Sequence, residues 1–366
     1  MGFAATIAGV STIGNTIDPA SANSVHEALA AYLAAREDLR SACIVEPPAP
    51  LGSGFDSFIY TFRVGGEVPD ARWSAPLVLR LQGNPAAVSK VRREADIQTF
   101  LIDAGYPVPA LLATEGADNP FGLPFMIMER VPGGTLLARV MSNPLRAGGL
   151  LARLAGVHAD LHRLPPAGWP LEDGDQPLAL RQITQFRRRI DEHGLDVLSD
   201  GLAWLERNVP AVLPETAVIT HNDFHPLNVL VTDQGQLSVI DWSDAALGDR
   251  HHDVARTLTL FSFAYIAASS SVERVVLKAA RGYLRSRYFN AYERTFPVDR
   301  RRLAYFEALQ SFHGLLQVSE LGLPTNRAQA ATEAASGLPS NLIEEIRVYV
   351  RRRMADAERV LNAAPG

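Results

Sequence analysis

Lysine and cysteine are the two residue types that this sequence uses least. Lysine occurs only at Lys90 and Lys278, and Cys43 is the only cysteine among 366 residues. A single cysteine excludes a disulfide framework within the chain and makes a reducing, cytoplasmic setting the expected one. We expect the thiol to behave as a small buried hydrophobe beside Ile44 and Val45.

A long hydrophobic run is also missing. The longest one, residues 258–268, contains Thr259 and Ser262 and is far shorter than the roughly 18 residues that suggest a membrane helix. Residues 1–23 contain neither Lys nor Arg, so they lack the charged start of a signal peptide. We expect these residues to form a flexible N-terminus and expect no membrane partner.

The remaining composition is that of an ordinary globular protein. Hydrophobic residues make up 47% of the chain and charged residues 20%, and the length allows two domains with separate cores. The net charge of −5 gives no sign of a nucleic-acid partner.

The expected elements divide the chain into a strand-rich part, residues 24–131, and a helix-rich part, residues 132–366. The first part should begin with a helix that has Ser24 as its possible N-cap, and a second helix should run from Asn84 to about Ala104. Strands are expected at 42–45, 58–64, 77–81 and 124–129. Helical patterns in the second part cover residues 150–161, 178–196, 197–208, 254–266, 272–292, 300–321 and 340–361. An α+β protein is therefore expected.

The most specific motif is His221-Asn222-Asp223-Phe224-His225-Pro226-Leu227-Asn228, followed after two short apolar strands by Asp241. Phosphoryl transfer requires a carboxylate near the attacking hydroxyl, and an amide and a second carboxylate that hold Mg²⁺. Asp223, Asn228 and Asp241 supply these three groups, on a loop and at a strand end. The motif therefore predicts a phosphotransferase.

Two other functions are compatible with parts of this motif. A zinc or iron hydrolase could use the cluster His221, Asp223, His225, His251 and His252. That hypothesis explains neither the spacing to Asn228 nor the position of Asp241, and the helical H-E-x-x-H spacing is missing. The second alternative is a nucleotide-binding module without catalytic activity.

On these residues the chain resembles the aminoglycoside phosphotransferase and choline kinase-like family, a branch of the protein-kinase-like fold. The family's catalytic loop reads H-G-D-[FY]-x-x-x-N, so Asn222 stands where Gly is usual. Residues 240–243 match its I-D-[WF]-[ES] strand, residues 128–133 its hinge and residues 161–164 its L-H-x-L helix end. The resemblance covers roughly residues 40–290.

The resemblance implies a fold and roles for individual residues. The fold would have two lobes, a small N-terminal one with an antiparallel sheet and a larger, mostly helical C-terminal one. Asp223 would be the catalytic base, Asn228 and Asp241 the metal ligands, and His221 would orient the loop. Asp253 would support the catalytic loop. For Asp249 and Asp253 we expect helix capping rather than direct catalysis.

A glycine-rich turn between the first two strands is the candidate phosphate loop. Gly52, Ser53, Gly54 and Ser57 lie there. Glycine lets the backbone approach phosphate oxygens closely and present N–H donors to them. The alternative is a hairpin turn that merely tolerates glycine.

Arg80 is the only cation in the third strand, where protein kinases have a phosphate-binding Lys. It lies between Leu79 and Leu81, and burial of an unpaired Arg is costly. Its expected partner is Glu94 in the following helix, so we propose that Glu94 orients Arg80 toward the α- and β-phosphates. The alternatives are an edge-strand charge for Arg80 and a surface ion pair for Glu94.

The nucleotide base is expected to bond to the backbone around Glu129 to Val131, with ATP as the default nucleotide. The acceptor is a small-molecule hydroxyl compound, either an antibiotic such as an aminoglycoside or macrolide or a metabolite alcohol. Its candidate contacts are Asp244, Asp160, Asp191, Glu192 and residues 300–345. A polycationic acceptor needs several converging carboxylates, and Glu320 stands alone among Leu315, Leu316, Val318 and Leu321. A monomer or a homodimer is expected.

Overall fold

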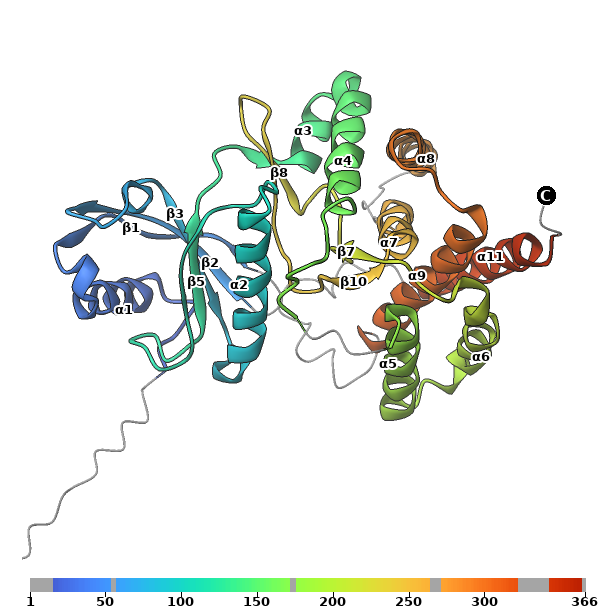
Figure 1. The fold of residues 1–366 in the computed structure, drawn as a ribbon, viewed down its shortest axis with the longest axis horizontal. Helices are drawn as coiled ribbons and strands as arrows, with labels where there is room; N and C mark the ends of the chain where they lie inside the picture. The colour runs from blue at the N-terminus through green and yellow to red at the C-terminus, as the bar shows by residue number, and fades with distance from the viewer. Residues whose placement is uncertain (1–15, 54–56, 172–175, 264–270, 322–341, 364–366) are drawn as a thin grey trace, which may run out of the picture. The chain divides into compact units, whose positions relative to one another are not determined.

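The computed structural model describes residues 16–53, 57–171, 176–263, 271–321 and 342–363. The chain forms two compact units, Met1–Pro132 and Gly133–Gly366. The first contains a five-stranded sheet, and the second contains most of the helices (Figure 1). The α+β class expected from the sequence is confirmed.

The sheet of the first unit is antiparallel throughout. Its strands are β1 (Ala42–Ser53), β2 (Ser57–Gly66), β3 (Leu77–Gln82), β4 (Leu111–Glu115) and β5 (Phe125–Glu129). They lie in the order β1-β2-β3-β5-β4, so β3 is the central strand. Four of the strands were expected, whereas β4 was not.

Two helices cover the two faces of this sheet, α1 (Ala22–Ala35) and α2 (Val88–Asp103). Phe125 and Ile127 of β5 are buried in the core shared with α1. Met126 lies between them in sequence and is buried against α2. This alternation follows from the period of two along a strand. Short 3₁₀ turns occur at Glu37–Leu39, Ala71–Ser74 and Pro85–Ala87.

Three details of the first unit differ from the sequence-based expectation. The N-cap of α1 is Ser21, whose side chain accepts from the Ser24 amide, so Ser24 lies inside the helix. Asn84 caps the 3₁₀ turn that precedes α2 rather than α2 itself. Cys43 is exposed, because every second residue of β1 at this position faces away from the core.

The second unit is built mainly from helices. These are α3 (Leu136–Ser142), α4 (Ala147–Leu161), α5 (Leu178–His193), α6 (Ser199–Asn208), α7 (Arg250–Phe263), α8 (Ser271–Thr295), α9 (Arg300–Leu321) and α11 (Leu342–Asn362), with 3₁₀ turns at Pro144–Arg146, Asp196–Leu198 and Val209–Val212. Of these α-helices only α3 was not expected. Residues 264–266 and 340–341, which belong to two predicted helices, lie outside the described residues, as do residues 1–15 of the expected flexible N-terminus.

Short strands frame the catalytic motif within this unit. β7 (Ala217–Thr220) pairs with β10 (Ala246–Asp249). β6 (Gly134–Thr135), β8 (Val229–Val231) and β9 (Leu237–Val239) form a second small sheet. The motif loop therefore begins at the end of β7 and ends at the start of β8.

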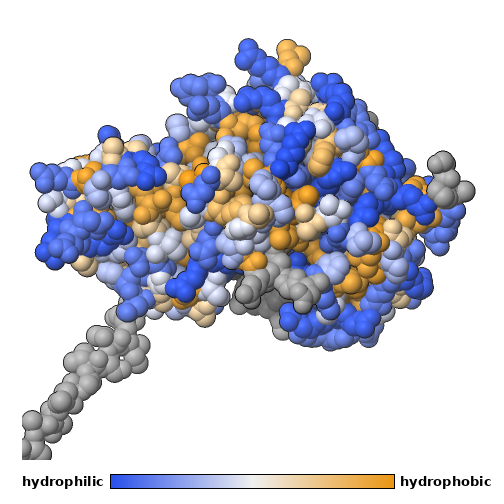
Figure 2. All heavy atoms as spheres, viewed as in Figure 1, coloured by the Kyte–Doolittle hydropathy of each residue, from blue (hydrophilic) through white to orange (hydrophobic). Residues whose placement is uncertain are grey.

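The described helices include none that is both long enough and apolar enough to cross a membrane. On the face shown in Figure 2, hydrophilic side chains project from both units. Leu145, at 99% exposure, is one of several single apolar side chains that reach solvent.

Candidate active site

Three side chains donate hydrogen bonds to the carboxylate of Asp223, two from the motif loop and one from α7. Oδ1 accepts a hydrogen bond from Nη2 of Arg256 (3.1 Å). Oδ2 lies 3.2 Å from Nε2 of His225 and accepts a bond of 3.2 Å from Nδ2 of Asn228. The structure therefore brings Asp223 and Asn228 together, as the spacing predicts, and adds Arg256 and His225.

These donors determine the charge of Asp223. Burial alone would raise the pKa of its carboxyl, but the hydrogen bond from His225 and the charge of Arg256 outweigh it. The pKa consequently lies well below its usual range. Asp223 is therefore ionised at neutral pH.

Asp241 follows β9 and lies next to Asn228. The Ile240 amide donates to the Asn228 carbonyl oxygen (3.0 Å), and Ser243 Oγ donates to Oδ1 of Asp241 (3.2 Å). Asp241 has a φ of +66°, a left-handed conformation that is uncommon for a residue other than glycine. The backbone therefore turns sharply where it presents this carboxylate.

Asn222 shares this left-handed conformation, with a φ of +62°. The conformation explains why glycine is usual at this position in the family that the motif resembles, and why Asn is tolerated. The side chain is also used: Nδ2 donates to the Asp244 carbonyl oxygen (3.0 Å), and Oδ1 lies 3.0 Å from Nδ1 of His252.

Asp253, at the start of α7, anchors the backbone of the loop. It is fully buried, and its two oxygens accept from the amides of His221 (2.6 Å) and Asn222 (2.9 Å). Oδ2 also lies 3.0 Å and 3.2 Å from Nε2 of His158 and His162. Asp253 thus supports the loop, and the expected role as a helix cap is wrong for this residue. Asp249 does act at the helix start, because it accepts from the His251 amide.

Two tyrosines of α8 complete the bonding of these histidines. The hydroxyl of Tyr288 lies 2.6 Å from Nδ1 of His158, and that of Tyr292 lies 2.6 Å from Nδ1 of His162. Each ring can thus donate from Nε2 to Asp253 and accept at Nδ1 from a tyrosine. Burial lowers the pKa of both histidines, that of His162 to about 4, so both are neutral.

The group His158, His162 and Asp253 has the residue types of a metal site, and it is the group of this kind found among the described residues. Both nitrogens of each ring are already hydrogen-bonded, which leaves no lone pair for a metal ion. The residues of the hydrolase hypothesis form no such group within the described part of the chain. His251 and His252, for example, bond to Asp249 and to Gln182.

Asn228 and Asp241 fit a hard divalent cation. The amide nitrogen of Asn228 donates twice to Asp223, which leaves its oxygen for other ligands. Carboxylate and amide oxygens are the donors that Mg²⁺ prefers. Asp244 lies close by, and its pKa is raised by desolvation from the surrounding protein atoms and by the charges of Asp223 and Asp241. A cation here would relieve that repulsion.

In the first unit, Arg80 and Glu94 form an ion pair between β3 and α2. The side chain of Glu94 is 2% exposed and that of Arg80 16%. Because β3 is the central strand and Glu94 is buried, the edge-strand and surface alternatives are both wrong. The pairing itself agrees with the sequence prediction, while a role in phosphate binding stays a prediction.

The candidate phosphate loop is shorter than expected. β1 continues through Gly52 and Ser53, which pair with Ile59 and Phe58, and β2 already begins at Ser57. Ser57 is buried. Gly54 lies outside the described residues.

The hinge residues lie at the end of β5. The Glu129 amide donates to the Ala110 carbonyl oxygen (2.9 Å), and the neighbouring Arg130 amide to that of Pro76 (3.0 Å). The Glu129 amide is therefore already in use, and Val131 is half-buried. Contact of Glu129 and Val131 with a nucleotide base stays a prediction.

The proposed acceptor contacts that the structure describes do not form one group, and residues 322–341 of the candidate range 300–345 lie outside the described residues. Asp160 and Glu192 lie in exposed ion pairs with Arg163 and Arg188. Glu320 is engaged by both Nε and Nη2 of Arg189. Asp191 is exposed. Of the carboxylates named from the sequence, only Asp244 interacts with Asp223 and Asp241.

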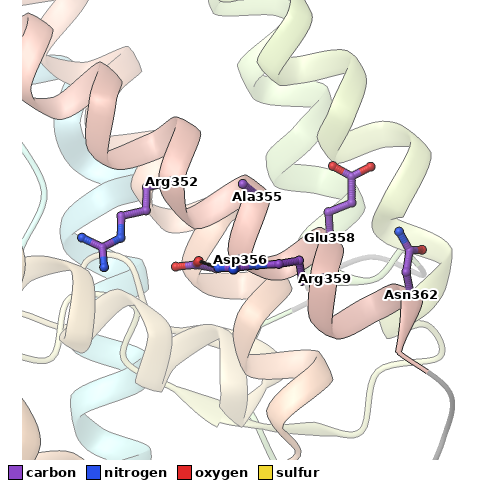
Figure 3. Close-up of a pocket in the computed structure, with 6 residues that line it drawn as sticks. All are labelled: Arg352, Ala355, Asp356, Glu358, Arg359 and Asn362. Atoms are coloured by element: carbon purple, nitrogen blue, oxygen red, sulfur yellow. Dashed lines mark hydrogen bonds and ion pairs between the residues drawn. The ribbon is translucent and has the colours of Figure 1, made fainter.

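Two surface hollows lie elsewhere in the second unit. One, of about 690 Å³, lies along a single side of α11 (Figure 3) and is lined by Arg352, Ala355, Asp356, Glu358, Arg359 and Asn362. The other, of about 720 Å³, lies beside α3 and the β8–β9 turn and includes Arg139, Arg146 and Arg153. Neither contains a residue of the motif loop.

The chain has the two-lobe, protein-kinase-like fold that its resemblance to the aminoglycoside phosphotransferase family implies. A proposed aminoglycoside phosphotransferase from Ralstonia eutropha has a TM-score of 0.62 and 16% identity, with 93% of this chain and 98% of that chain covered. The model of the phosphotransferase enzyme family matches residues 49–306, which include every motif residue above. The chain belongs to this family.

Two curated relatives are similar over shorter stretches. Acyl-CoA dehydrogenase family member 11 of Gallus gallus is 28% identical over 177 residues, which are 45% of this chain and 22% of that protein. Viomycin phosphotransferase of Streptomyces vinaceus is 28% identical over 190 residues, 46% of this chain and 62% of that protein. The chain thus spans less than a quarter of the first relative and less than two thirds of the second.

Proposed function

We propose that this protein is an ATP- and Mg²⁺-dependent phosphotransferase that moves the γ-phosphate to a hydroxyl of a small molecule. The observation that carries the proposal is the joint placement of Asp223, Asn228 and Asp241 by the loop that Asp253 anchors. Membership of the phosphotransferase enzyme family supports it.

In the proposed reaction, Asp223 binds and orients the acceptor hydroxyl. The acceptor oxygen forms a bond to the γ-phosphorus while the bond from that phosphorus to the ADP oxygen breaks. The hydroxyl proton passes to Asp223 and then to water. In a loose transition state the attacking oxygen forms little bond to phosphorus, so the positioning of the hydroxyl by Asp223 contributes most.

Asn228 and Asp241 would hold Mg²⁺ through their side-chain oxygens. When bound, the ion neutralises charge on the phosphate oxygens. The left-handed backbone at Asp241 and the two bonds from the Asn228 amide nitrogen fix both ligands before the ion arrives.

Residues of the first unit would bind the nucleotide. Arg80, oriented by the buried Glu94, is the proposed cation for the α- and β-phosphates. The turn at Gly52, Ser53, Gly54 and Ser57 would supply backbone donors, and the backbone at Glu129 and Val131 would bind the base. A nucleotide cosubstrate and a single cysteine favour a cytoplasmic protein, as a monomer or a homodimer.

The described residues favour an acceptor that is not a polycation. Among them, Asp244 is the one acceptor candidate whose pKa is raised by the charges of Asp223 and Asp241. Glu320 is neutralised by Arg189, and Asp160 and Glu192 are bound to other arginines at the surface. A hydroxyl compound without several positive charges, such as a macrolide, a sugar or a hydroxyacyl derivative, is therefore preferred over an aminoglycoside.

The test is ADP release from Mg·ATP with a panel of aminoglycosides, macrolides, choline, sugars, amino alcohols and hydroxyacyl compounds. We expect acceptor-dependent release that falls at least 100-fold in Asp223→Asn, a magnitude in the range of about 10²–10⁴ for general-base catalysis. Asp200→Asn, which removes an exposed carboxylate of α6, is the matched control and should keep full activity. ATP binding without turnover on any acceptor would support the inactive-module alternative instead.

A further inference from the structure

Arg256 is a buried cation beside the proposed base that no sequence motif marks. It lies on α7, three residues after the loop anchor Asp253, and its side chain is 10% exposed. Nη2 donates to Oδ1 of Asp223, whereas Nε is buried without a hydrogen-bond partner among the described residues. Leaving a buried guanidinium nitrogen unsatisfied is costly, so the position of this side chain needs an explanation.

The two oxygens of Asp223 are not equally available. Oδ2 is already bonded to both His225 and Asn228, whereas Arg256 is the one partner of Oδ1 among the described residues. A carboxylate oxygen has two lone-pair positions, so Oδ1 keeps one for a new donor. An incoming hydroxyl would therefore bond to Oδ1, next to the guanidinium.

We propose that Arg256 is a positioning residue for the acceptor: it fixes Asp223 so that Oδ1 receives the acceptor hydroxyl, and its charge lies on the acceptor side of the base. This inference rests on the proposed function. It predicts that Arg256 affects turnover and the use of the acceptor but not the binding of ATP. A planar, charged group that binds Oδ1 from one fixed direction is needed, so lysine should replace it poorly.

The experiment compares Arg256→Ala and Arg256→Lys with the same two changes at Arg285. Arg285 also lies on a helix of this unit and also pairs with a carboxylate, Glu307, but it makes no contact with the motif loop among the described residues. We expect Arg256→Ala to lower kcat about 10- to 100-fold, because a misplacement near 1 Å can cost that much. The KM for ATP should stay within about twofold, and Arg256→Lys should recover only part of the loss.

Chemical rescue separates positioning from a structural role. Millimolar guanidinium should restore part of kcat in Arg256→Ala and nothing in Arg285→Ala. A kcat of Arg256→Ala equal to wild type, or an equal loss in both alanine variants with no rescue, would overturn the proposal.

If the wild-type protein phosphorylates no acceptor, the proposed function fails and the kinetic test of Arg256 cannot be made. A second measurement then tests the contact between Arg256 and Asp223 by itself. Urea unfolding of Arg256→Gln, Asp223→Asn and the double variant measures the coupling between the two side chains without any activity. A double variant that loses clearly less stability than the two single changes together supports the contact. Additive losses would overturn it.

Discussion

Replacing Asp253 by Asn should both destabilise the second unit and disable the motif loop. The carboxylate accepts from two backbone amides and two imidazole rings in a fully buried position. Asn offers one oxygen and an NH₂ group, so at least one of these donors would face another donor. The change alters neither size nor shape, which makes it a test of the hydrogen bonds alone.

The magnitude follows from the number of bonds lost. A hydrogen bond to a charged group contributes about 1.5–3 kcal/mol, and a buried donor left unsatisfied costs about 1–3 kcal/mol. One lost bond and one unsatisfied amide give a loss of about 2.5–6 kcal/mol, a large share of the roughly 5–15 kcal/mol that stabilises a domain. Removing a buried charge would offset part of this. However, His158 and His162 hold the pKa of Asp253 well below its usual range in spite of burial, so the charged form is the favoured one.

Urea unfolding followed by tryptophan fluorescence measures this loss, and ADP release measures the effect on the loop. The matched control is Asp160→Asn, which removes an exposed carboxylate and should change the free energy of unfolding by less than about 0.5 kcal/mol. An Asp253→Asn variant with stability within about 1 kcal/mol of wild type would refute the view that this carboxylate holds the loop.

Three further predictions concern individual positions. Gly133→Ala should lower the free energy of unfolding by about 2–4 kcal/mol, because the φ of Gly133 is +125° and an added Cβ would lie 2.1 Å from the Val231 carbonyl oxygen. The control Gly134→Ala, whose added Cβ would meet no atom within 4 Å, should cost under about 1 kcal/mol. Equal losses of the two variants in urea unfolding would contradict this. Asn222→Gly should retain more activity and stability than Asn222→Ala, because both lose the bonds to Asp244 and His252 but only Ala is strained by the left-handed φ of this position. The reverse order would be evidence against strain here. The free energy of unfolding should fall as the pH drops from about 6.5 to about 4, because burial lowers the pKa of His162 and of His252 from 6.5 to about 4 and the unfolded chain then binds more protons than the folded one. His162 alone accounts for about 3 kcal/mol, at about 1.4 kcal/mol per pKa unit. Urea midpoints that do not change over this pH range would contradict the neutral, buried state of these histidines.

The sequence predicts the parts of the site that depend on spacing along the chain. Asp223 and Asn228 lie five residues apart on one loop, and the following hairpin returns the chain to Asp241, so local geometry is enough to bring them together. The Arg80–Glu94 pair was also predictable, because strand alternation and helix periodicity place both side chains on facing surfaces. The short strands β4 and β7 were missed.

The contacts made by residues distant in sequence were not predictable. Nothing near Arg256 indicates that it bonds to Asp223, 33 residues earlier, because the packing of α7 decides this. The hydrogen bonds of His158 and His162 with Tyr288 and Tyr292 span 130 positions, so no local pattern in the sequence indicates them. The expected burial of Cys43 was wrong because apolar neighbours in a strand do not tell which face a residue takes.

The bonds between His158 and Tyr288 and between His162 and Tyr292 also bear on the order of folding. Each joins residues that are 130 positions apart. Contacts of such long sequence separation form late and slow the search for the native state. When the motif loop leaves the ribosome, the tyrosines of α8 have not yet been synthesised, so the histidines that hold Asp253 still lack their second partners. We therefore expect the nascent chain to gain a correctly held loop only after α8 has docked on α4.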